Sequence, residues 1–492
     1  MVGNRRSLAL CALTVSELAR GLENGSFSSE AVTDAYLENI ALQNSTLNVF
    51  LEVFGDTARE EARASDRRRR EGKPLSRLDG VPFAVKDNLC VEGRLCTCAS
   101  RMLENYRSPY TATAVRRLQE AGMPLLGRVN LDEFAMGSST ETSFFGPSRN
   151  PWDASRVPGG SSGGCAAAVA AGMAPVALGS DTGGSIRQPA SFCGVTGIKP
   201  TYGAVSRYGL LAYASSLDQI GPLTIDARDA AAVTAALMGK DEMDATSVAA
   251  PVPVLPEKAR LDGLRVGIPQ AYFGEGLDAD VRERVMDAAH ELERLGATLV
   301  EVDMPILKYS IPAYYILACA EASSNLSRYD GVKYGFRPAH FEDLHDLYLT
   351  ARSEGFGAEV KRRIMLGAFA LSSGYYDAYY NKALRVKALI KRGFDACFEK
   401  ADILLTPAAP TTAYPLGAHA DDPIQMYLGD IYTVSVNMAG LPGMVVPCGF
   451  DGAGLPVGAQ MIAPAFGEQR LFDAACAYQA RTAFHRARPK ED

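Results

Sequence analysis

The sequence is poor in the features that mark several large classes of protein. Ten cysteines in 492 residues are too few for a disulfide scaffold. The longest apolar run, from Ala166 to Gly179, is too short to span a bilayer. Basic residues are not in excess, since the chain contains 50 Lys and Arg and 57 Asp and Glu. The net charge of −7 therefore argues against a broad nucleic-acid-binding face on this chain.

The N-terminus carries no clear targeting signal. Arg5 and Arg6 precede an apolar stretch from Leu8 to Val15, which is at the lower length limit for a signal peptide and has no small-residue cleavage pattern. We therefore expect a cytoplasmic protein.

The sequence also lacks the motifs that are typical of metal and nucleotide sites. Cys90, Cys96 and Cys98 form the one cysteine cluster, but they lack the paired C-x-x-C spacing and the fourth ligand of a zinc site. We interpret them as reduced thiols in a loop. No glycine-rich element ends in the G-K-[ST] of a phosphate-binding loop, so we expect this chain to bind neither a metal nor a nucleotide cofactor.

Signals for helices and strands alternate along most of the chain. The first 75 residues indicate helices, the first of them opened by the capping sequence from Thr14 to Glu17. Strands are expected at 81–85, 124–127, 175–178, 265–268, 298–302, 403–405, 444–447 and 457–462, with helices at 112–121, 165–171 and 281–295. This alternation predicts an α/β protein with a mostly parallel sheet covered on both faces.

We expect residues 1–492 to form a single domain built from consecutive segments. These are an N-terminal helical segment (1–75), a catalytic core (76–240), a helical insertion (312–400) and a C-terminal part (401–492) whose strands complete the same sheet.

Two glycine-rich elements contain serines and can bring backbone amides close to a ligand: GGSSGG at 159–164 and DTGGSIR at 181–187. The first matches the G-x-S-x-G nucleophile elbow of α/β-hydrolases, around either Ser161 or Ser162. That mechanism needs a histidine base, and the five histidines are His290, His340, His345, His419 and His485. None lies in a glycine-bounded loop, so surface or packing roles are favoured for all five.

Lysine can replace histidine as the base if burial disfavours its charged form. Lys86 ends an apolar strand, where its side chain could enter a cleft at the sheet edge. A lone lysine after a strand is usually a surface charge. Only the presence of both glycine–serine loops makes Lys86 a catalytic candidate.

Lys86, Ser161 in GGSSGG and Ser185 in DTGGSIRQPA together resemble the amidase signature family. The resemblance implies a large mixed central β-sheet covered by helices on both faces. It also implies a Ser–cis-Ser–Lys triad in which Ser185 attacks an amide and Ser161, with a cis peptide bond, relays the proton to neutral Lys86. The implied oxyanion hole consists of the backbone amides of Thr182, Gly183, Gly184 and Ser185.

Segments outside these motifs narrow the resemblance to the glutaminase subunits of tRNA-dependent amidotransferases. They are residues 136–143, 197–203, 205–209, 321–331, 361–364 and 372–380. The resemblance implies that glutamine is hydrolysed through a glutamyl ester at Ser185 and that ammonia passes to a partner. That partner, the B subunit of such enzymes, would use ATP and Mg²⁺ to amidate Glu-tRNA(Gln) or Asp-tRNA(Asn), and a small C subunit would complete a heterotrimer.

Free glutamine carries an α-carboxylate and an α-ammonium, so its pocket should offer a cation and an anion. By resemblance the candidates are Arg363 and Asp430, with Tyr314 as a hydroxyl partner. Arg362 and Tyr315 remain as alternatives to their neighbours in sequence.

Cys165 stands where members of this group often carry serine. A small thiol is tolerable at a helix start and leaves the triad intact, although an exposed one would be open to oxidation or alkylation.

The sequence also leaves three other functions open. A free-standing amidase acting on a small carboxamide would use the same triad without partners. A non-catalytic glycine-rich binding module would make the set of Lys86, Ser161 and Ser185 coincidental, and a histidine-dependent hydrolase would not need Lys86.

Overall fold

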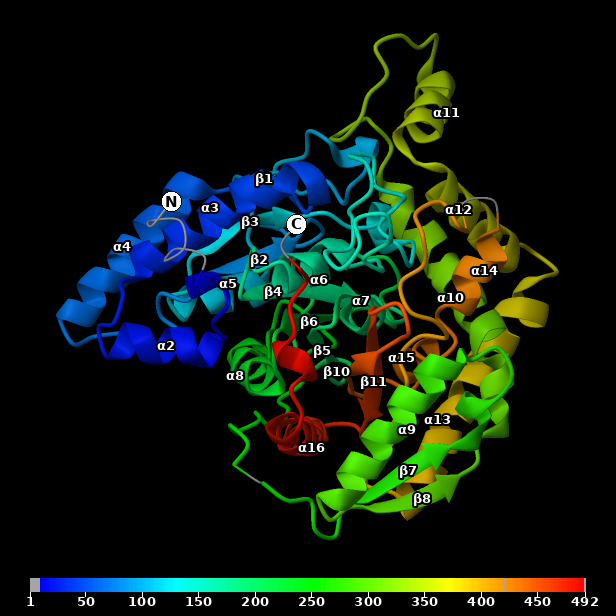
Figure 1. Ribbon diagram of the computed structural model, residues 1–492. Coiled ribbons are helices and arrows are strands. Elements are labelled where there is room, and N and C mark those ends of the chain that lie inside the picture. The colour runs from blue at the N-terminus through cyan, green and yellow to red at the C-terminus, as the bar shows by residue number, and fades with distance from the viewer. Residues whose placement is uncertain (1–8, 258, 420–421, 491–492) are drawn as a thin grey trace.

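One large β-sheet organises the molecule, which we describe from a computed structural model covering residues 9–257, 259–419 and 422–490. The sheet has eleven strands in the order β1-β3-β2-β4-β6-β5-β10-β11-β9-β7-β8 (Figure 1). The strands are β1 (Phe50–Val53), β2 (Phe83–Lys86), β3 (Leu125–Val129), β4 (Val176–Asp181), β5 (Thr196–Lys199), β6 (Gln219–Thr224), β7 (Arg265–Pro269), β8 (Thr298–Val302), β9 (Ile403–Pro407), β10 (Gly443–Phe450) and β11 (Pro456–Ile462).

Helices surround this sheet (Figure 1). The α-helices are α2 (Val15–Glu23), α3 (Ser29–Leu47), α4 (Gly55–Arg70), α5 (Thr113–Glu120), α6 (Gly163–Ala170), α7 (Arg187–Cys193), α8 (Ala227–Leu237), α9 (Ala279–Arg294), α10 (Ser310–Asn325), α11 (Leu344–Gly355), α12 (Ala358–Leu371), α13 (Lys382–Lys400), α14 (Pro423–Leu428), α15 (Val434–Met438) and α16 (Glu468–Arg481). Short 3₁₀ helices are η1 (Arg101–Leu103), η2 (Glu133–Ala135), η3 (Gln270–Phe273), η4 (Pro305–Tyr309), η5 (Leu326–Arg328) and η7 (Phe484–Arg486), and η6 (Tyr376–Asn381) is a π-helix.

The central strands are buried along their whole length, which requires cover on both faces of the sheet. Two helices contact the same strand at several points: α6 and α8 both pack on β6, and α7 and α9 both pack on β10 and β11. The expected α/β fold, a large mixed sheet with helical cover, is confirmed.

The expectation of a mostly parallel sheet was wrong. Parallel pairing occurs between β2 and β3, β2 and β4, β7 and β8, and β7 and β9, whereas every other neighbouring pair is antiparallel. Three strands that the local patterns did not indicate, β1, β5 and β6, supply antiparallel partners. β6 contains Gly221 and Pro222, which weaken the strand signal, and only its place between β4 and β5 makes it a strand.

In the described part of the N-terminal segment, residues 9–75, the strand β1 accompanies the helices, which corrects the expectation of helices alone. β1 pairs with β3 at one end of the sheet, and this long-range pairing is invisible in the local sequence. The capping box at the start of α2 is confirmed, since the Thr14 side chain accepts from the Glu17 amide and Glu17 accepts from the Thr14 amide. The block between β8 and β9 is helical as expected, with α10 to α13 in sequence.

None of the helices in the described ranges is long and apolar enough to cross a membrane. Arg5, Arg6 and Leu8, at the start of the possible targeting signal, lie outside the described residues. Cys90 and Cys96 are buried free thiols with their Sγ atoms 4.0 Å apart. Within the described ranges, no group of three or more His, Cys, Asp or Glu side chains is placed to hold a metal ion.

Candidate active site

Lys86 lies at the carboxyl end of β2 and is completely buried. Its Nζ is 2.8 Å from Ser161 Oγ, 2.8 Å from Ser162 Oγ and 3.0 Å from Ser180 Oγ. Burial lowers the pKa of Lys86 to about 8, although the nearby carboxylates of Asp132 and Asp181 oppose this shift. The lysine can therefore exist as a neutral amine in contact with Ser161, as a base must.

The loop that carries Ser161 depends on its glycines. The Gly160–Ser161 peptide bond is cis, as the family resemblance implied. A Cβ at Gly160 would lie 2.1 Å from Asp132 Oδ2, and one at Gly164 would lie 2.3 Å from the Asn130 carbonyl oxygen. Atoms of other segments thus come too close for any side chain at these positions.

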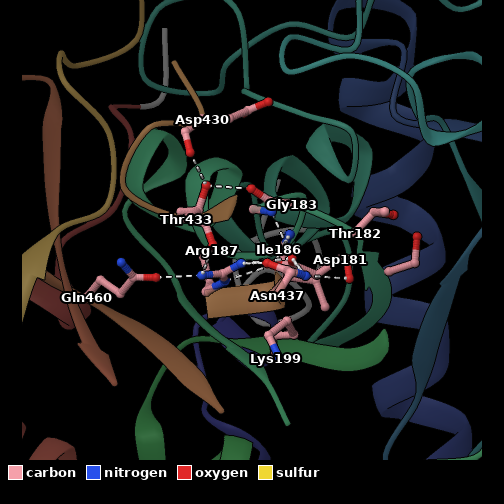
Figure 2. A network of polar contacts seen from close by, with 12 residues as sticks. Asp181, Thr182, Gly183, Ile186, Arg187, Lys199, Asp430, Thr433, Asn437 and Gln460 are labelled. Carbon is pink, nitrogen blue, oxygen red and sulfur yellow. Dashed lines mark hydrogen bonds and ion pairs between the residues drawn. The ribbon is translucent and has the colours of Figure 1, made fainter. Parts of the chain in front are cut away.

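The loop that carries Ser185 follows β4 and is organised by the Asp181 carboxylate. This carboxylate accepts hydrogen bonds from the Gly184 amide at 2.8 Å, from the Ile186 amide at 3.1 Å and from the Arg187 guanidinium (Figure 2). Burial alone would raise the pKa of Asp181, but the charge of Arg187 outweighs burial and holds it well below its usual range. The Ser162 amide donates to the Ser185 carbonyl at 3.1 Å and joins the two serine loops.

Ser185 keeps a small exposed fraction of 8%, whereas Ser161 and Lys86 have none. Of the three residues of the expected triad, the nucleophile is therefore the one with exposed surface. The Gly184 amide is already bound to Asp181, so the amides of Thr182, Gly183 and Ser185 remain as candidates to face an oxyanion.

The expected pocket residues Asp430 and Arg363 are brought together through Tyr315. Asp430 is buried, accepting a hydrogen bond from Ser138 Oγ at 3.0 Å and from Tyr315 Oη at 2.8 Å. Burial raises the pKa of Asp430 to about 6. The Arg363 guanidinium lies 5.2 Å from the centre of the Tyr315 ring.

Of the two candidate arginines, Arg362 and Arg363, only Arg363 is buried. Its Nε donates to Glu359 Oε1 at 2.7 Å, and a second nitrogen donates to Tyr213 Oη at 2.7 Å. Arg362 is far more exposed, with a side-chain exposed fraction of 44%, and also pairs with Glu359. Of the two arginines, only Arg363 has buried, aromatic surroundings, and the Glu359 carboxylate already pairs with it there.

Tyr314 and Tyr315, the two candidate tyrosines, both contact the site but in different ways. The Tyr314 ring packs against Gly183, where a Cβ would lie 2.5 Å from its hydroxyl-bearing carbon. Tyr315 donates to Asp430 and stacks on Tyr427 with ring centres 4.0 Å apart. The pattern had not singled out Ser138 or Tyr427, although Ser138 belongs to a segment that carried the family resemblance.

The histidines take no part in this arrangement. His290, His340 and His345 are exposed and His419 is half-buried. His485 is buried, and burial lowers its pKa to about 4. The base in contact with Ser161 Oγ is a lysine, which removes the reason to prefer a histidine-dependent elbow hydrolase.

Cys165 is fully buried at the start of α6, with its Sγ 3.4 Å from the Leu178 carbonyl oxygen. Burial raises the pKa of the Cys165 thiol to about 12. The condition for oxidation or alkylation, an exposed thiol, is therefore not met.

A pH dependence follows from the state of Lys86. The neutral amine is the reactive form, and its fraction rises with pH through the pKa of about 8. We expect kcat/KM for amide hydrolysis to increase over this range and to level off above it, because kcat/KM reports the free enzyme. A profile measured from about pH 5 to about pH 10 tests this. A midpoint of about 6.5, typical of a histidine base, would contradict it.

Comparison with known proteins adds to this geometry. The profile of the Amidase family matches residues 31–472. The chain is 55% identical over 485 residues to the A subunit of the glutamyl-tRNA(Gln) amidotransferase of Moorella thermoacetica, covering 98% of this chain and 99% of that one. It is 53% identical over 482 residues to the protein of the same name from Dechloromonas aromatica, covering 97% and 98% of the two chains.

Solved structures share the fold. The crystal structure of the glutamyl-tRNA(Gln) amidotransferase A subunit from Thermotoga maritima matches with a TM-score of 0.80 at 42% identity, covering 96% of this chain and 95% of that one. The peptide amidase of Stenotrophomonas maltophilia matches with a TM-score of 0.81 at 32% identity, covering 97% and 98%. Enzymes named for different amides thus share this fold. Their TM-scores to this chain are nearly equal, so they are distinguished by sequence identity and not by the similarity of the folds.

Proposed function

The chain belongs to the amidase family, and we propose that it is the glutamine-hydrolysing subunit of a tRNA-dependent amidotransferase. The observation that carries the proposal is the buried pair of Arg363 and Asp430, linked by Tyr315 and lying beside the Ser185 loop. A cation and an anion in one pocket suit the two charged groups of a free α-amino acid. The high identity to proteins named as A subunits of glutamyl-tRNA(Gln) amidotransferase supports glutamine as that amino acid.

In the proposed binding mode, the guanidinium of Arg363 holds the α-carboxylate and Asp430 holds the α-ammonium of glutamine. Tyr314, packed on Gly183, would lie beside the substrate next to the Ser185 loop. Asp430 must be ionised for this role, which its pKa of about 6 permits at neutral pH. The side-chain amide is thereby directed to the serine loops.

Acylation begins when Ser185 Oγ attacks the side-chain carbonyl carbon of glutamine. The hydroxyl proton passes through Ser161 Oγ to the neutral Lys86 Nζ, 2.8 Å away from that oxygen. Backbone amides of the Ser185 loop stabilise the tetrahedral oxyanion. Lys86 then returns a proton by the same path to the departing nitrogen, which leaves as ammonia and a glutamyl ester remains on Ser185.

Deacylation repeats these roles with water as the nucleophile. Lys86, neutral again, accepts a proton from water through Ser161 while the water oxygen bonds to the ester carbon. The ester bond breaks, Ser185 Oγ recovers its proton, and glutamate leaves. The net reaction converts glutamine and water into glutamate and ammonia.

The ammonia is consumed by a partner in this proposal. The relatives are named as A subunits, which indicates a multi-subunit enzyme, and we assign this chain to a cytoplasmic heterotrimer with a B subunit and a small C subunit. The B subunit would bind ATP and Mg²⁺ and amidate Glu-tRNA(Gln) or Asp-tRNA(Asn). The net charge of −7 fits a chain that leaves most of the RNA contact to its partner.

The test is to trap the acyl-enzyme. The complex is incubated with glutamine, quenched in acid and digested, and the peptide containing Ser185 is weighed. We expect a glutamyl ester on that peptide after incubation with glutamine and no aspartyl ester after incubation with asparagine. Ester formation and ammonia release should rise when the partner subunits and aminoacyl-tRNA are present. An isolated chain that hydrolyses small carboxamides equally well without partners would instead support a free-standing amidase.

A further inference from the structure

Thr433 is a completely buried residue that the catalytic steps above do not use. Its Oγ1 lies 2.5 Å from the Gly183 carbonyl oxygen and 3.1 Å from the Asp430 carbonyl oxygen. Figure 2 shows Thr433 joined by dashed lines to Asp430 above it and to Gly183 beside it. Gly183 belongs to the Ser185 loop and Asp430 to the proposed ammonium site, so one hydroxyl contacts both ends of the glutamine site.

The hydroxyl carries a single proton and faces two carbonyl acceptors. The Asp430 carbonyl already accepts from the amides of Thr433 at 3.0 Å and Val434 at 3.1 Å. Among the residues that the structure describes, no other donor reaches the Gly183 carbonyl. The Thr433 proton therefore serves Gly183, at the shorter of its two distances.

The peptide group between Gly183 and Gly184 is held by two hydrogen bonds, one at its carbonyl and one at its N–H. Thr433 holds its carbonyl, and Asp181 Oδ1 accepts from its N–H at 2.8 Å. Thr433 also packs directly on the loop, since a Cβ at Gly184 would lie 2.3 Å from its Oγ1. The orientation of this peptide sets the direction of the neighbouring amides that would face an oxyanion.

The backbone of Thr433 is tied to both sides as well. Its amide donates to the Asp430 carbonyl, and its own carbonyl accepts from the Arg187 guanidinium at 3.1 Å. Arg187 in turn binds the Asp181 carboxylate that organises the Ser185 loop. Buried, hydrogen-bonded groups therefore connect Asp430 through Thr433 to the loop without interruption.

We propose that Thr433 is a positioning residue that couples occupation of Asp430 by an α-ammonium to the productive orientation of the Ser185 loop. The coupling makes hydrolysis selective for amides that carry this group, beyond the selectivity that binding alone provides. This inference rests on the proposed function and deepens it, since it assigns substrate discrimination to a residue that does not touch substrate.

The test compares two substrates in the intact complex: glutamine and glutaramate, the monoamide of glutarate, which is glutamine without its α-amino group. Thr433→Val removes the hydroxyl at constant shape. We expect it to lower kcat for glutamine by about 10- to 100-fold while changing KM by less than about threefold. For glutaramate, which cannot engage Asp430, kcat should fall by less than about threefold. The selectivity ratio between the substrates therefore shrinks.

Two variants control this result. Thr433→Ser keeps the hydroxyl and should restore most of kcat and of the selectivity ratio. Thr234→Val makes the same change at another buried threonine, whose hydroxyl has no hydrogen-bond partner among the described residues, and should leave both substrates unaffected. Equal losses for both substrates in Thr433→Val, or no loss, would overturn the coupling.

Failure of the coupling can be told apart from failure of the proposed function. If the wild-type complex releases no ammonia from glutamine, the proposed function is wrong and the coupling falls with it. If the wild-type complex prefers glutamine and Thr433→Val keeps the same preference, only the coupling is wrong.

Discussion

Replacing Ser185 by alanine is expected to lower kcat for glutamine hydrolysis by about 10⁴-fold or more. The substitution removes the oxygen that forms the ester, and Ser161 is not expected to take its place, because it is completely buried whereas Ser185 has exposed surface. Since Ser185 is 8% exposed and its side chain is small, folding should be preserved. Ammonia release by the complex, measured in single-turnover assays, gives the result.

The control for this prediction is Ser310→Ala. Ser310 is also buried, and its hydroxyl has no hydrogen-bond partner among the described residues. We expect this variant to keep wild-type activity, so that a loss in Ser185→Ala is specific to the nucleophile. Substantial ammonia release from Ser185→Ala would exclude Ser185 as the nucleophile. It would leave a binding module or another catalytic serine as the explanation.

Replacing Lys86 by methionine is expected to lower kcat by about 10³-fold or more, because it removes the base in contact with Ser161. Methionine has a similar length and suits a site with no exposed surface. The desolvation that lowers the pKa of Lys86 also costs the folded state free energy at neutral pH, where the unfolded chain carries the charge freely. Methionine escapes this cost, which offsets the lost hydrogen bonds, so Tm should change by only a few degrees.

Lys86→Arg separates the need for a base from the need for a positive charge. Arginine stays protonated at every accessible pH and cannot accept the proton of Ser161. We therefore expect a loss of activity similar to that in Lys86→Met, measured by ammonia release and with Tm as the check on folding. An active arginine variant would mean that Lys86 acts only by its charge.

Local sequence patterns predicted many of the helices and strands correctly. The capping box of α2 and most strands of apolar residues could be read directly, because they depend on neighbours within a few positions. β5 and β6 could not, since β6 contains Gly221 and Pro222 and is a strand only through pairing on both sides. The alternation of strands and helices therefore suggested a mostly parallel sheet, and the antiparallel strands that the pattern missed make it mixed.

The glutamine pocket shows a different limit of sequence reasoning. Resemblance pointed to Arg363 and to Asp430 but left Arg362 as an open alternative, because adjacent residues on a helix differ only in the face that they present. Burial separates them, since Arg363 has a side-chain exposed fraction of 3% and Arg362 one of 44%. Ser138 lies in a segment that carried the family resemblance, but neither its role nor that of Thr433 is visible locally, because both depend on contacts with residues hundreds of positions away.

The sequence by itself determined which chemical groups this protein can offer: a lysine, two serine loops rich in glycine, and the family that combines them. These are properties of short segments, where residue type and spacing are enough. The tertiary structure alone decided what each group can do. It buries Lys86 and lowers its pKa to about 8, and it sets Thr433 against Gly183 across a separation of 250 residues. Burial and long-range contact are set by the packing of distant segments, and no local pattern contains them.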